Sequence, residues 1–272
     1  MKVVLFCGGQ GMRLRELSEH IPKPMVPIGY RPILWHLMRY YAHFGHKDFI
    51  LCLGYKADVI KEYFLKYDET LSNDFVLSDG GSKLQLLNRD IADWRITFVE
   101  TGSQTNIGGR LVAVRKHLEG EEMFLANYSD GLCDLPLDRY LDSFVNSQAI
   151  AKFVAVRPTT TFHIVDLQET GVVRGVQELS ESGIWMNGGF FAFRSEIFDY
   201  IRQGEDIVAE PFDRLIKEQR LVAEKYDGFW MSMETFKDKQ LLDDLYSRGV
   251  APWEHLIEEP EIVLSPGERQ TD

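Results

Sequence analysis

Short apolar runs alternate with longer segments of helical periodicity along the first 150 residues. The apolar runs predict buried strands, at Val3–Cys7, Phe49–Leu53, Arg95–Val99 and Met123–Ala126. The segments between them carry apolar residues at helical spacing and predict helices, at Pro32–Phe44, Lys56–Tyr67 and Gly109–Leu118. Strands that alternate with helices are typical of βαβ units, so we expect a mainly parallel sheet flanked by helices.

After residue 150 the pattern becomes richer in strands. Strand-like runs separated by short turns lie at Ala151–Val156, His163–Leu167, Val172–Gln177 and Trp185–Phe193. Helical spacing returns at Ser195–Arg202, Pro211–Arg220 and Phe236–Arg248. No obvious linker interrupts the chain, so we predict one α/β domain over residues 1–254. Its Rossmann-like, mixed and mainly parallel sheet would carry a smaller β-rich part, and residues 255–272 would form an acidic, peripheral tail.

The composition narrows the class of partner. Among 272 residues, 30 are Lys or Arg and 42 are Asp or Glu, which gives a net charge of −12. Nonspecific binding to nucleic acid needs a basic face, so this balance argues against a nucleic-acid partner. A small anionic substrate in a locally basic pocket remains compatible with it.

The cysteines and the N-terminus bear on the compartment. Cys7, Cys52 and Cys133 show neither the spacing of a zinc site nor a redox CxxC pair, and their odd number suits a reducing compartment. The start of the chain does not resemble a signal peptide, and no apolar run reaches the roughly 20 residues of a membrane span. We therefore expect a cytoplasmic protein with no membrane partner.

The stretch LFCGGQGMRLRE, residues 5–16, is a candidate phosphate-binding loop. It lacks the lysine of a Walker A loop, and the dinucleotide fingerprint G-x-G-x-x-G fails at Leu14. Glycines would let backbone N–H groups approach a triphosphate, while Arg13 and Arg15 would neutralise its charge. The alternative is a tight turn with solvated arginines.

Lys23 lies between two prolines, in Ile21-Pro22-Lys23-Pro24-Met25. Proline fixes its own φ and restrains the residue before it, so the backbone around Lys23 has little freedom. A lysine that must hold one position against a phosphoryl group benefits from such restraint. A plain proline-rich turn is the alternative.

These two segments, with motifs further along, carry a resemblance to a known family. The motifs that follow in order are Pro32-Ile33-Leu34-Trp35-His36, Gly54-Tyr55-Lys56, Thr101-Gly102, Gly109-Arg110-Leu111, Ser129-Asp130-Gly131, Asn187-Gly188-Gly189-Phe190-Phe191, Gly228-Phe229-Trp230 and Ala251-Pro252-Trp253. The chain from residue 1 to about 254 resembles the sugar-1-phosphate nucleotidyltransferases. Within that family it most resembles the glucose-1-phosphate cytidylyltransferases.

The resemblance implies a nucleotide-diphospho-sugar transferase fold and a magnesium-dependent reaction. A sugar 1-phosphate, with glucose 1-phosphate favoured, would attack the α-phosphate of a nucleoside triphosphate in line and release pyrophosphate. CTP is the favoured triphosphate. The first half of the domain, at about residues 1–150, would bind the nucleotide. The second half, at about residues 151–235, would bind the sugar phosphate. The resemblance also implies a homo-oligomer.

The resemblance also assigns roles to single residues. Those implied in catalysis are Arg13, Lys23 and Asp130. Those implied in nucleotide binding are Gly8, Gly9, Gly11, Met12, Arg13, Lys23, Gly109 and Arg110. Those implied in sugar-phosphate binding are Tyr128, Glu178, Asn187 and Gly188. Asp130, just after an apolar strand, and Glu234 would hold Mg²⁺, which prefers a few carboxylates together with water and substrate phosphates.

The chain departs from the family pattern at three of its positions. Met12 stands where many members have a hydroxyl residue, Leu179 stands where many have a lysine, and Glu234 stands where most have aspartate. These departures keep open a second hypothesis, a catalytically silent relative that binds nucleotide or sugar phosphate as a regulator or scaffold. A nicotinamide oxidoreductase is a distant third, because its glycine fingerprint is broken.

Overall fold

Strand β1 (Val3–Phe6) lies at the centre of an eight-stranded sheet, and all its residues are buried. The computed structural model describes residues 1–9, 21–159 and 162–256. β1 runs parallel to β4 (Asp48–Leu53) on one side and to β8 (Met123–Tyr128) on the other. β7 (Arg95–Glu100) continues the sheet beyond β4, also in parallel. These strands confirm the predicted parallel core of the sheet.

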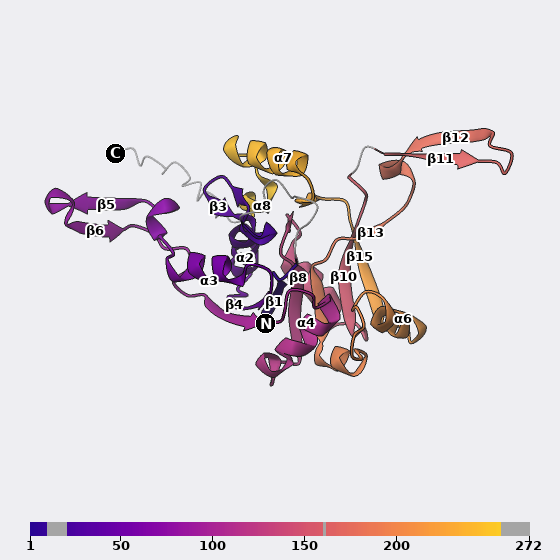
Figure 1. Ribbon diagram of the computed structural model, residues 1–272, viewed down its shortest axis with the longest axis horizontal. Coiled ribbons are helices and arrows are strands. Elements are labelled where there is room, and N and C mark those ends of the chain that lie inside the picture. The colour runs from indigo at the N-terminus through magenta and orange to yellow at the C-terminus, as the bar shows by residue number, and fades with distance from the viewer. Residues whose placement is uncertain (10–20, 160–161, 257–272) are drawn as a thin grey trace, which may run out of the picture.

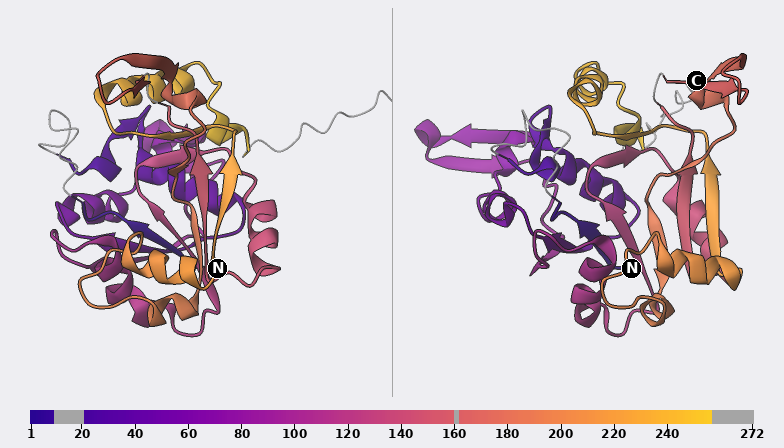
Figure 2. Two further views of the ribbon diagram at one scale, coloured as in Figure 1. Left: turned by 90° about the vertical axis from the view of Figure 1, so that its right-hand side faces the viewer. Right: turned by 45° about the vertical axis from the view of Figure 1, so that its right-hand side comes forward.

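The second half of the chain completes the same sheet. β14 (Phe191–Arg194) runs antiparallel to β8 and to β10 (Ala151–Val156). β10 also pairs with β13 (Met186–Asn187) in antiparallel and with β15 (Leu221–Tyr226) in parallel orientation. Figure 2 shows the early strands in purple and the later strands in pink and orange. The sheet is therefore mixed and mostly parallel, which confirms the predicted fold class.

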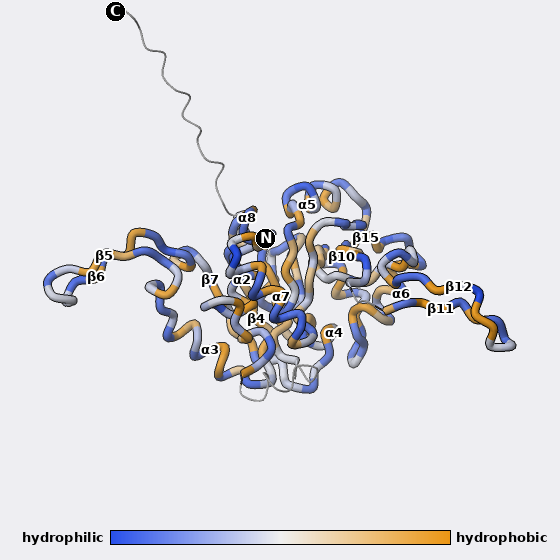
Figure 3. Tube along the Cα trace, turned by 90° about the horizontal axis from the view of Figure 1, so that it is seen from above, coloured by the Kyte–Doolittle hydropathy of each residue, from blue (hydrophilic) through white to orange (hydrophobic). Residues whose placement is uncertain are grey.

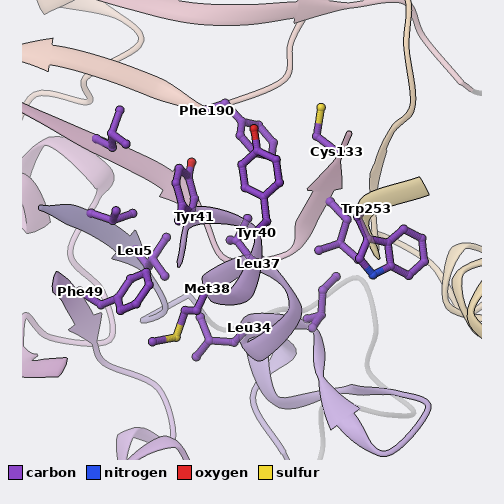
Figure 4. Packing of buried hydrophobic residues seen from close by; sticks show 14 of the residues in the cluster. Leu5, Leu34, Leu37, Met38, Tyr40, Tyr41, Phe49, Cys133, Phe190 and Trp253 are labelled. Atoms are coloured by element: carbon purple, nitrogen blue, oxygen red, sulfur yellow. The ribbon is translucent and has the colours of Figure 1, made fainter. Parts of the chain in front are cut away.

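Helices cover both faces of the sheet. Alternate residues of β1 point to opposite faces, so Val3 and Leu5 enter one hydrophobic core, and Val4 and Phe6 enter the other. The first core includes residues of α2 (Ile33–His43), α3 (Ala57–Leu65), α5 (Leu137–Val145), α7 (Phe236–Ser247) and α8 (Pro252–His255), and Figure 4 shows its centre. The second core includes residues of α4 (Ile107–Val114), the 3₁₀ turns η5 (Arg115–Leu118) and η7 (Ser195–Asp199), and α6 (Glu210–Lys217).

Two hairpins project from opposite ends of the body (Figure 1). One consists of β5 (Phe75–Ser78) and β6 (Lys83–Leu86), and the other of β11 (His163–Leu167) and β12 (Val173–Glu178). Figure 3 shows hydrophobic segments along both. Two smaller antiparallel pairs are the hairpin of β2 (Pro27–Ile28) with β3 (Arg31–Pro32), and the pairing of β9 (Gly131–Cys133) with the distant strand β16 (Trp230–Ser232). The remaining elements are 3₁₀ turns, at η2 (Lys23–Met25), η3 (Glu69–Leu71), η4 (Asp79–Gly81) and η6 (Leu179–Glu181).

Some predicted elements differ from the observed ones. The run Trp185–Phe193 is two strands, because the backbone bends between them, with positive φ at Gly189 and Phe190. The predicted helix Ser195–Arg202 is the shorter 3₁₀ turn η7. α5, β15 and the β5–β6 hairpin were not predicted. The predicted acidic tail lies outside the described residues from 257 onward. No helix within the described ranges is long and apolar enough to cross a membrane.

Candidate active site

A cavity of about 570 Å³ opens where β1 and β8 end. The two strands are parallel neighbours, with Phe6 opposite Tyr128, so the segments that follow them emerge at the same edge of the sheet. Carboxyl ends of parallel strands are where α/β sheets bind ligands. The cavity is lined from the β1 end by Cys7 and Gly9, and from the β8 end by Ser129 and Asp130.

Lys23 reaches into this cavity from the 3₁₀ turn η2. Its Nζ donates a hydrogen bond to Oδ2 of Asp130 at 2.5 Å and lies 3.1 Å from Oε1 of Glu234. The side chain of Lys23 is only 12% exposed. The structure thus brings together the predicted lysine and both predicted metal ligands, which come from three separate parts of the chain.

Backbone pairing explains why Asp130 and Glu234 meet. β9 follows Asp130, β16 precedes Glu234, and the two strands pair with Gly131 opposite Ser232. Beyond the pair, the N–H of Met233 donates to the carbonyl of Asp130 at 2.8 Å. Glu234 is then held at the start of α7, where its N–H donates to the side chain of Asp238, a member of the helix's capping box.

Arg110 places a second positive charge on the cavity wall. It is the fourth residue of α4, and its Nη1 donates to Oγ1 of Thr101 at 2.7 Å and to the carbonyl of Leu53 at 3.3 Å. It is 3% exposed, and burial lowers the pKa of its guanidinium. No carboxylate pairs with it in the parts of the chain that the structure describes.

The guanidinium of Arg110 occupies the space that a side chain at position 8 would need. A Cβ at Gly8 would lie 1.8 Å from Nη1 of Arg110, so a larger residue would displace the guanidinium from this position. The predicted helix start is two residues off, since α4 begins at Ile107, capped by Asn106, whose side chain accepts from Gly109 N–H. Gly11, Met12 and Arg13 lie outside the described residues.

The predicted sugar-phosphate residues divide into two places. Asn187 donates to the hydroxyl of Tyr128 at 3.4 Å, and the indole of Trp230 donates to the carbonyl of neighbouring Gly188. Tyr128 lines the cavity, and its pKa is raised to about 12 by burial and then by the negative charges of Asp206 and Asp130. Glu178, by contrast, is an exposed residue at the end of the projecting strand β12 and is not among the lining residues.

Sequence reasoning missed part of the cavity wall. Residues 103–106, just before α4, and Asp206 line it. The motif Thr101-Gly102 borders the first of these segments and gives a local signal for it. Asp206 has no such signal, since its loop reaches the site only because the backbone of Glu205 packs against Gly108 and Asn106 donates to Gly204.

The two carboxylates of Asp130 and Glu234 fit a magnesium ion. Both have an oxygen in contact with the same ammonium, so their oxygens converge on one small volume. Within the described ranges, no group of three or more His, Cys, Asp or Glu side chains is arranged to hold a metal. Two carboxylates are what Mg²⁺ commonly receives from a protein when substrate phosphates and water complete its shell.

The protein thus has an α/β fold with a cavity at the carboxyl ends of two parallel strands, lined by Lys23, Arg110, Asp130 and Glu234. The sequence model of the nucleotidyl transferase family matches residues 2–238, so the chain belongs to that family. This confirms the predicted family and the prediction of a transferase.

Curated relatives support the finer resemblance. The chain is 38% identical over 255 residues to a glucose-1-phosphate cytidylyltransferase of Salmonella typhi, covering 93% of this chain and 98% of the relative. It is 34% identical to a probable glucose-1-phosphate cytidylyltransferase of Bacillus subtilis, covering 93% and 99%. A solved UDP-glucose pyrophosphorylase with UDP-glucose superposes with a TM-score of 0.66 at 15% identity, over 91% of this chain and 98% of that one, which shows the shared fold.

Proposed function

We propose that the protein joins CTP to glucose 1-phosphate and releases pyrophosphate. A phosphate oxygen of the sugar phosphate forms the new bond to the α-phosphorus, and the bond from that phosphorus to the bridging oxygen of the β-phosphate breaks. The products are CDP-glucose and pyrophosphate. The identity to glucose-1-phosphate cytidylyltransferases over almost the whole chain supports this choice of substrates.

One observation carries the proposal within the site: among the described residues, no carboxylate pairs with the buried guanidinium of Arg110. A buried guanidinium without a carboxylate is costly unless an anion reaches it. Arg110 faces the same cavity as Lys23, and Lys23 is held beside two carboxylates. A polyphosphate in this cavity would supply the missing negative charge to Arg110 and a second acceptor to Lys23.

The residues act mainly by position and charge. The attacking phosphate oxygen is already ionised near neutral pH, so the site needs no general base. Lys23 would bind the α-phosphate and the incoming sugar phosphate, and Arg110 would bind the nucleotide, so that both cations offset the charge that moves onto pyrophosphate. Mg²⁺, held by Asp130 and Glu234, would supply further charge neutralisation at the phosphates.

The sugar phosphate would lie on the side of Tyr128, Asn187 and Gly188, which belong to or border the second half of the chain. We accordingly assign nucleotide binding to residues of about 1–150 and sugar-phosphate binding to those of about 151–235. Leu179 offers no charge to the sugar phosphate, so the preference for glucose 1-phosphate depends on these polar groups.

We also propose a homo-oligomer. The two projecting hairpins expose apolar side chains, including Leu77 and Val176, which are 57% and 60% exposed. Two-stranded hairpins have little stability alone in water, so contacts between copies of the chain would stabilise them. Light scattering tests this assembly, and a monomer at micromolar concentration would contradict it.

We expect the protein in the reducing cytoplasm. The thiols of Cys7, Cys52 and Cys133 are buried and form no disulfide, which suits that compartment.

A matrix of nucleoside triphosphates against sugar 1-phosphates, with Mg²⁺ and a pyrophosphate readout, tests the reaction. We expect the highest kcat/KM for CTP with glucose 1-phosphate, and no turnover by Asp130→Ala. Turnover with another pair would correct the substrates. Nucleotide binding without turnover by any pair would instead support the silent relative.

A further inference from the structure

Lys23 and a bound metal ion would share the same two carboxylates. The ammonium of Lys23 lies 2.5 Å from Oδ2 of Asp130 and 3.1 Å from Oε1 of Glu234. These are the two carboxylates that would hold Mg²⁺. A divalent ion bound through them would lie within a few ångströms of an ammonium, where two positive charges repel strongly in a partly buried site.

The surroundings strengthen this competition. The Lys23 side chain is 12% exposed and that of Asp130 is 20% exposed, so water screens their interaction only in part. Charged groups that share a partly dry site influence each other more than exposed pairs do. A divalent ion on these carboxylates would therefore weaken the contacts that Lys23 makes with both of them.

The structure gives Lys23 a second place to go. Its backbone is restrained by Pro22 and Pro24, and Pro24 is buried. The flexible four-carbon stem of lysine can still turn without any backbone change. Lys23, Pro24 and Arg110 line the same cavity, so an ammonium that leaves Asp130 and Glu234 can face a phosphate that also contacts Arg110.

We propose that Lys23 serves as an exchangeable counter-ion of the metal site. It neutralises Asp130 and Glu234 until a divalent ion takes these carboxylates, and the released ammonium then turns to the substrate phosphate. The inference deepens the proposed function, because it depends on the metal role of Asp130 and Glu234. The exchange couples the binding of the metal ion to the binding of the phosphate. The ion favours the position of Lys23 that faces the phosphate, and the phosphate draws Lys23 away from the carboxylates that bind the ion.

Binding of Mn²⁺ alone, without nucleotide, tests the first half of this exchange. Mn²⁺ affinity would be measured by the loss of free-ion EPR signal for the unmodified protein, Lys23→Met and Lys66→Met. Lys23→Met keeps the length of the side chain and removes its charge. Lys66→Met is the matched control, since it removes the same charge from an exposed pair with Glu62 on the surface.

We expect Lys23→Met to bind Mn²⁺ at least about tenfold more tightly than the unmodified protein, and Lys66→Met to bind it equally well. Adding Asp130→Asn to Lys23→Met should abolish the gain. Equal or weaker binding by Lys23→Met would overturn the inference. So would a gain that survives Asp130→Asn, because the ion would then lie elsewhere. A cooperative thermal unfolding transition would show that each variant is folded.

A crystal soaked with Mn²⁺ tests the movement directly. The ion should contact Asp130 and Glu234, and Nζ of Lys23 should lie beyond hydrogen-bonding distance of both. Contacts from Nζ to both carboxylates beside a bound ion would contradict the exchange. Both tests are independent of turnover, so the activity matrix can fail while the exchange holds, and the exchange can fail while the reaction proceeds.

Discussion

A side-chain contact between Glu254 and His36 links α8, near the end of the described chain, to α2 in its first part. Nδ1 of His36 lies 3.3 Å from Oε1 of Glu254, and Nε2 of His36 lies 3.0 Å from the carbonyl oxygen of Ile28. Each ring nitrogen of His36 therefore faces an oxygen atom, one from a side chain and one from the backbone. The pair thereby fastens α8 to α2 and to the β2–β3 hairpin, which follows the turn of Lys23.

Stability should depend on pH through this pair. Burial alone would raise the pKa of Glu254, but the hydrogen bond and charge of His36 and the charge of Arg39 lower it. A carboxylate whose pKa is lowered by folding stabilises the protein at pH values above its pKa in the unfolded state. This contribution disappears as the pH falls through its pKa in the folded state. Glu254→Gln should therefore cost about 1.5 kcal/mol of unfolding free energy at pH 7, and much less in acid.

Unfolding in urea at several pH values measures this difference. Glu62→Gln is the control, because Glu62 forms an exposed pair with Lys66 within one helix. We expect a small effect from it at every pH. A deficit of Glu254→Gln that stays constant from pH 7 to acid would contradict the ionic role of Glu254.

Gly8→Ala should impair nucleotide binding while leaving the fold intact. The added Cβ would meet the tip of the Arg110 side chain, which can yield by turning away from the cavity. Displacing this charge should raise the KM for the triphosphate by about tenfold or more. Gly175→Ala is the control, since nothing lies within 4 Å of its Cβ. An unchanged KM for Gly8→Ala would show that Arg110 does not bind the nucleotide.

The sequence predicts those elements whose signal is local. β1, β4 and β8 contain continuous apolar runs because both faces of the sheet are covered, and they were predicted within two residues of their ends. β15 (LVAEKY) carries polar residues at a sheet edge and lacks such a run, so it was missed. The break between β13 and β14 depends on Gly189, whose Cβ would collide with Asn127, a contact that only the folded chain creates.

The candidate site shows the same limit. Motifs singled out Lys23 and Asp130, yet they lie 107 positions apart, and their contact arises from the parallel sheet that aligns the segments after β1 and β8. The contact of Lys23 with Glu234 depends in addition on the pairing of β9 with β16. Neither pairing has a marker in the local sequence, so the family resemblance supplied the residues and the structure supplied their geometry.

Gly29→Ala should destabilise the support of the Lys23 segment. Gly29 has a φ of +61°, and its Cβ would lie 2.2 Å from the ring of Tyr246 in α7. The ring packs against His36 and Tyr30, so it has little room to yield. We expect a loss of about 2 kcal/mol or more. Gly45 is the control position, since it has a positive φ of +81° and no atom within 4 Å of its Cβ. Gly45→Ala should therefore lose only about 1 kcal/mol of unfolding free energy. Equal losses for the two variants in thermal unfolding would contradict the packing role of Gly29.

Lys23→Ala should lower kcat/KM by at least about a hundredfold without unfolding the protein. The variant removes the ammonium beside the reacting phosphate, while the backbone of the turn remains fixed by its prolines. Steady-state pyrophosphate release measures the rate, and circular dichroism checks the fold. Lys66→Ala should retain normal activity. Near-normal turnover by Lys23→Ala would count decisively against this active site.

Glu234→Asp tests whether the longer carboxylate is a metal ligand. The substitution keeps the charge but withdraws the oxygens by one methylene, from a residue whose backbone is held at the start of α7. Magnesium demands strict geometry, so the Mg²⁺ concentration for half-maximal activity should rise by roughly three- to tenfold. Titration of the rate with Mg²⁺ measures it, with Glu62→Asp as the surface control. If the two variants give the same Mg²⁺ dependence, Glu234 is not a metal ligand.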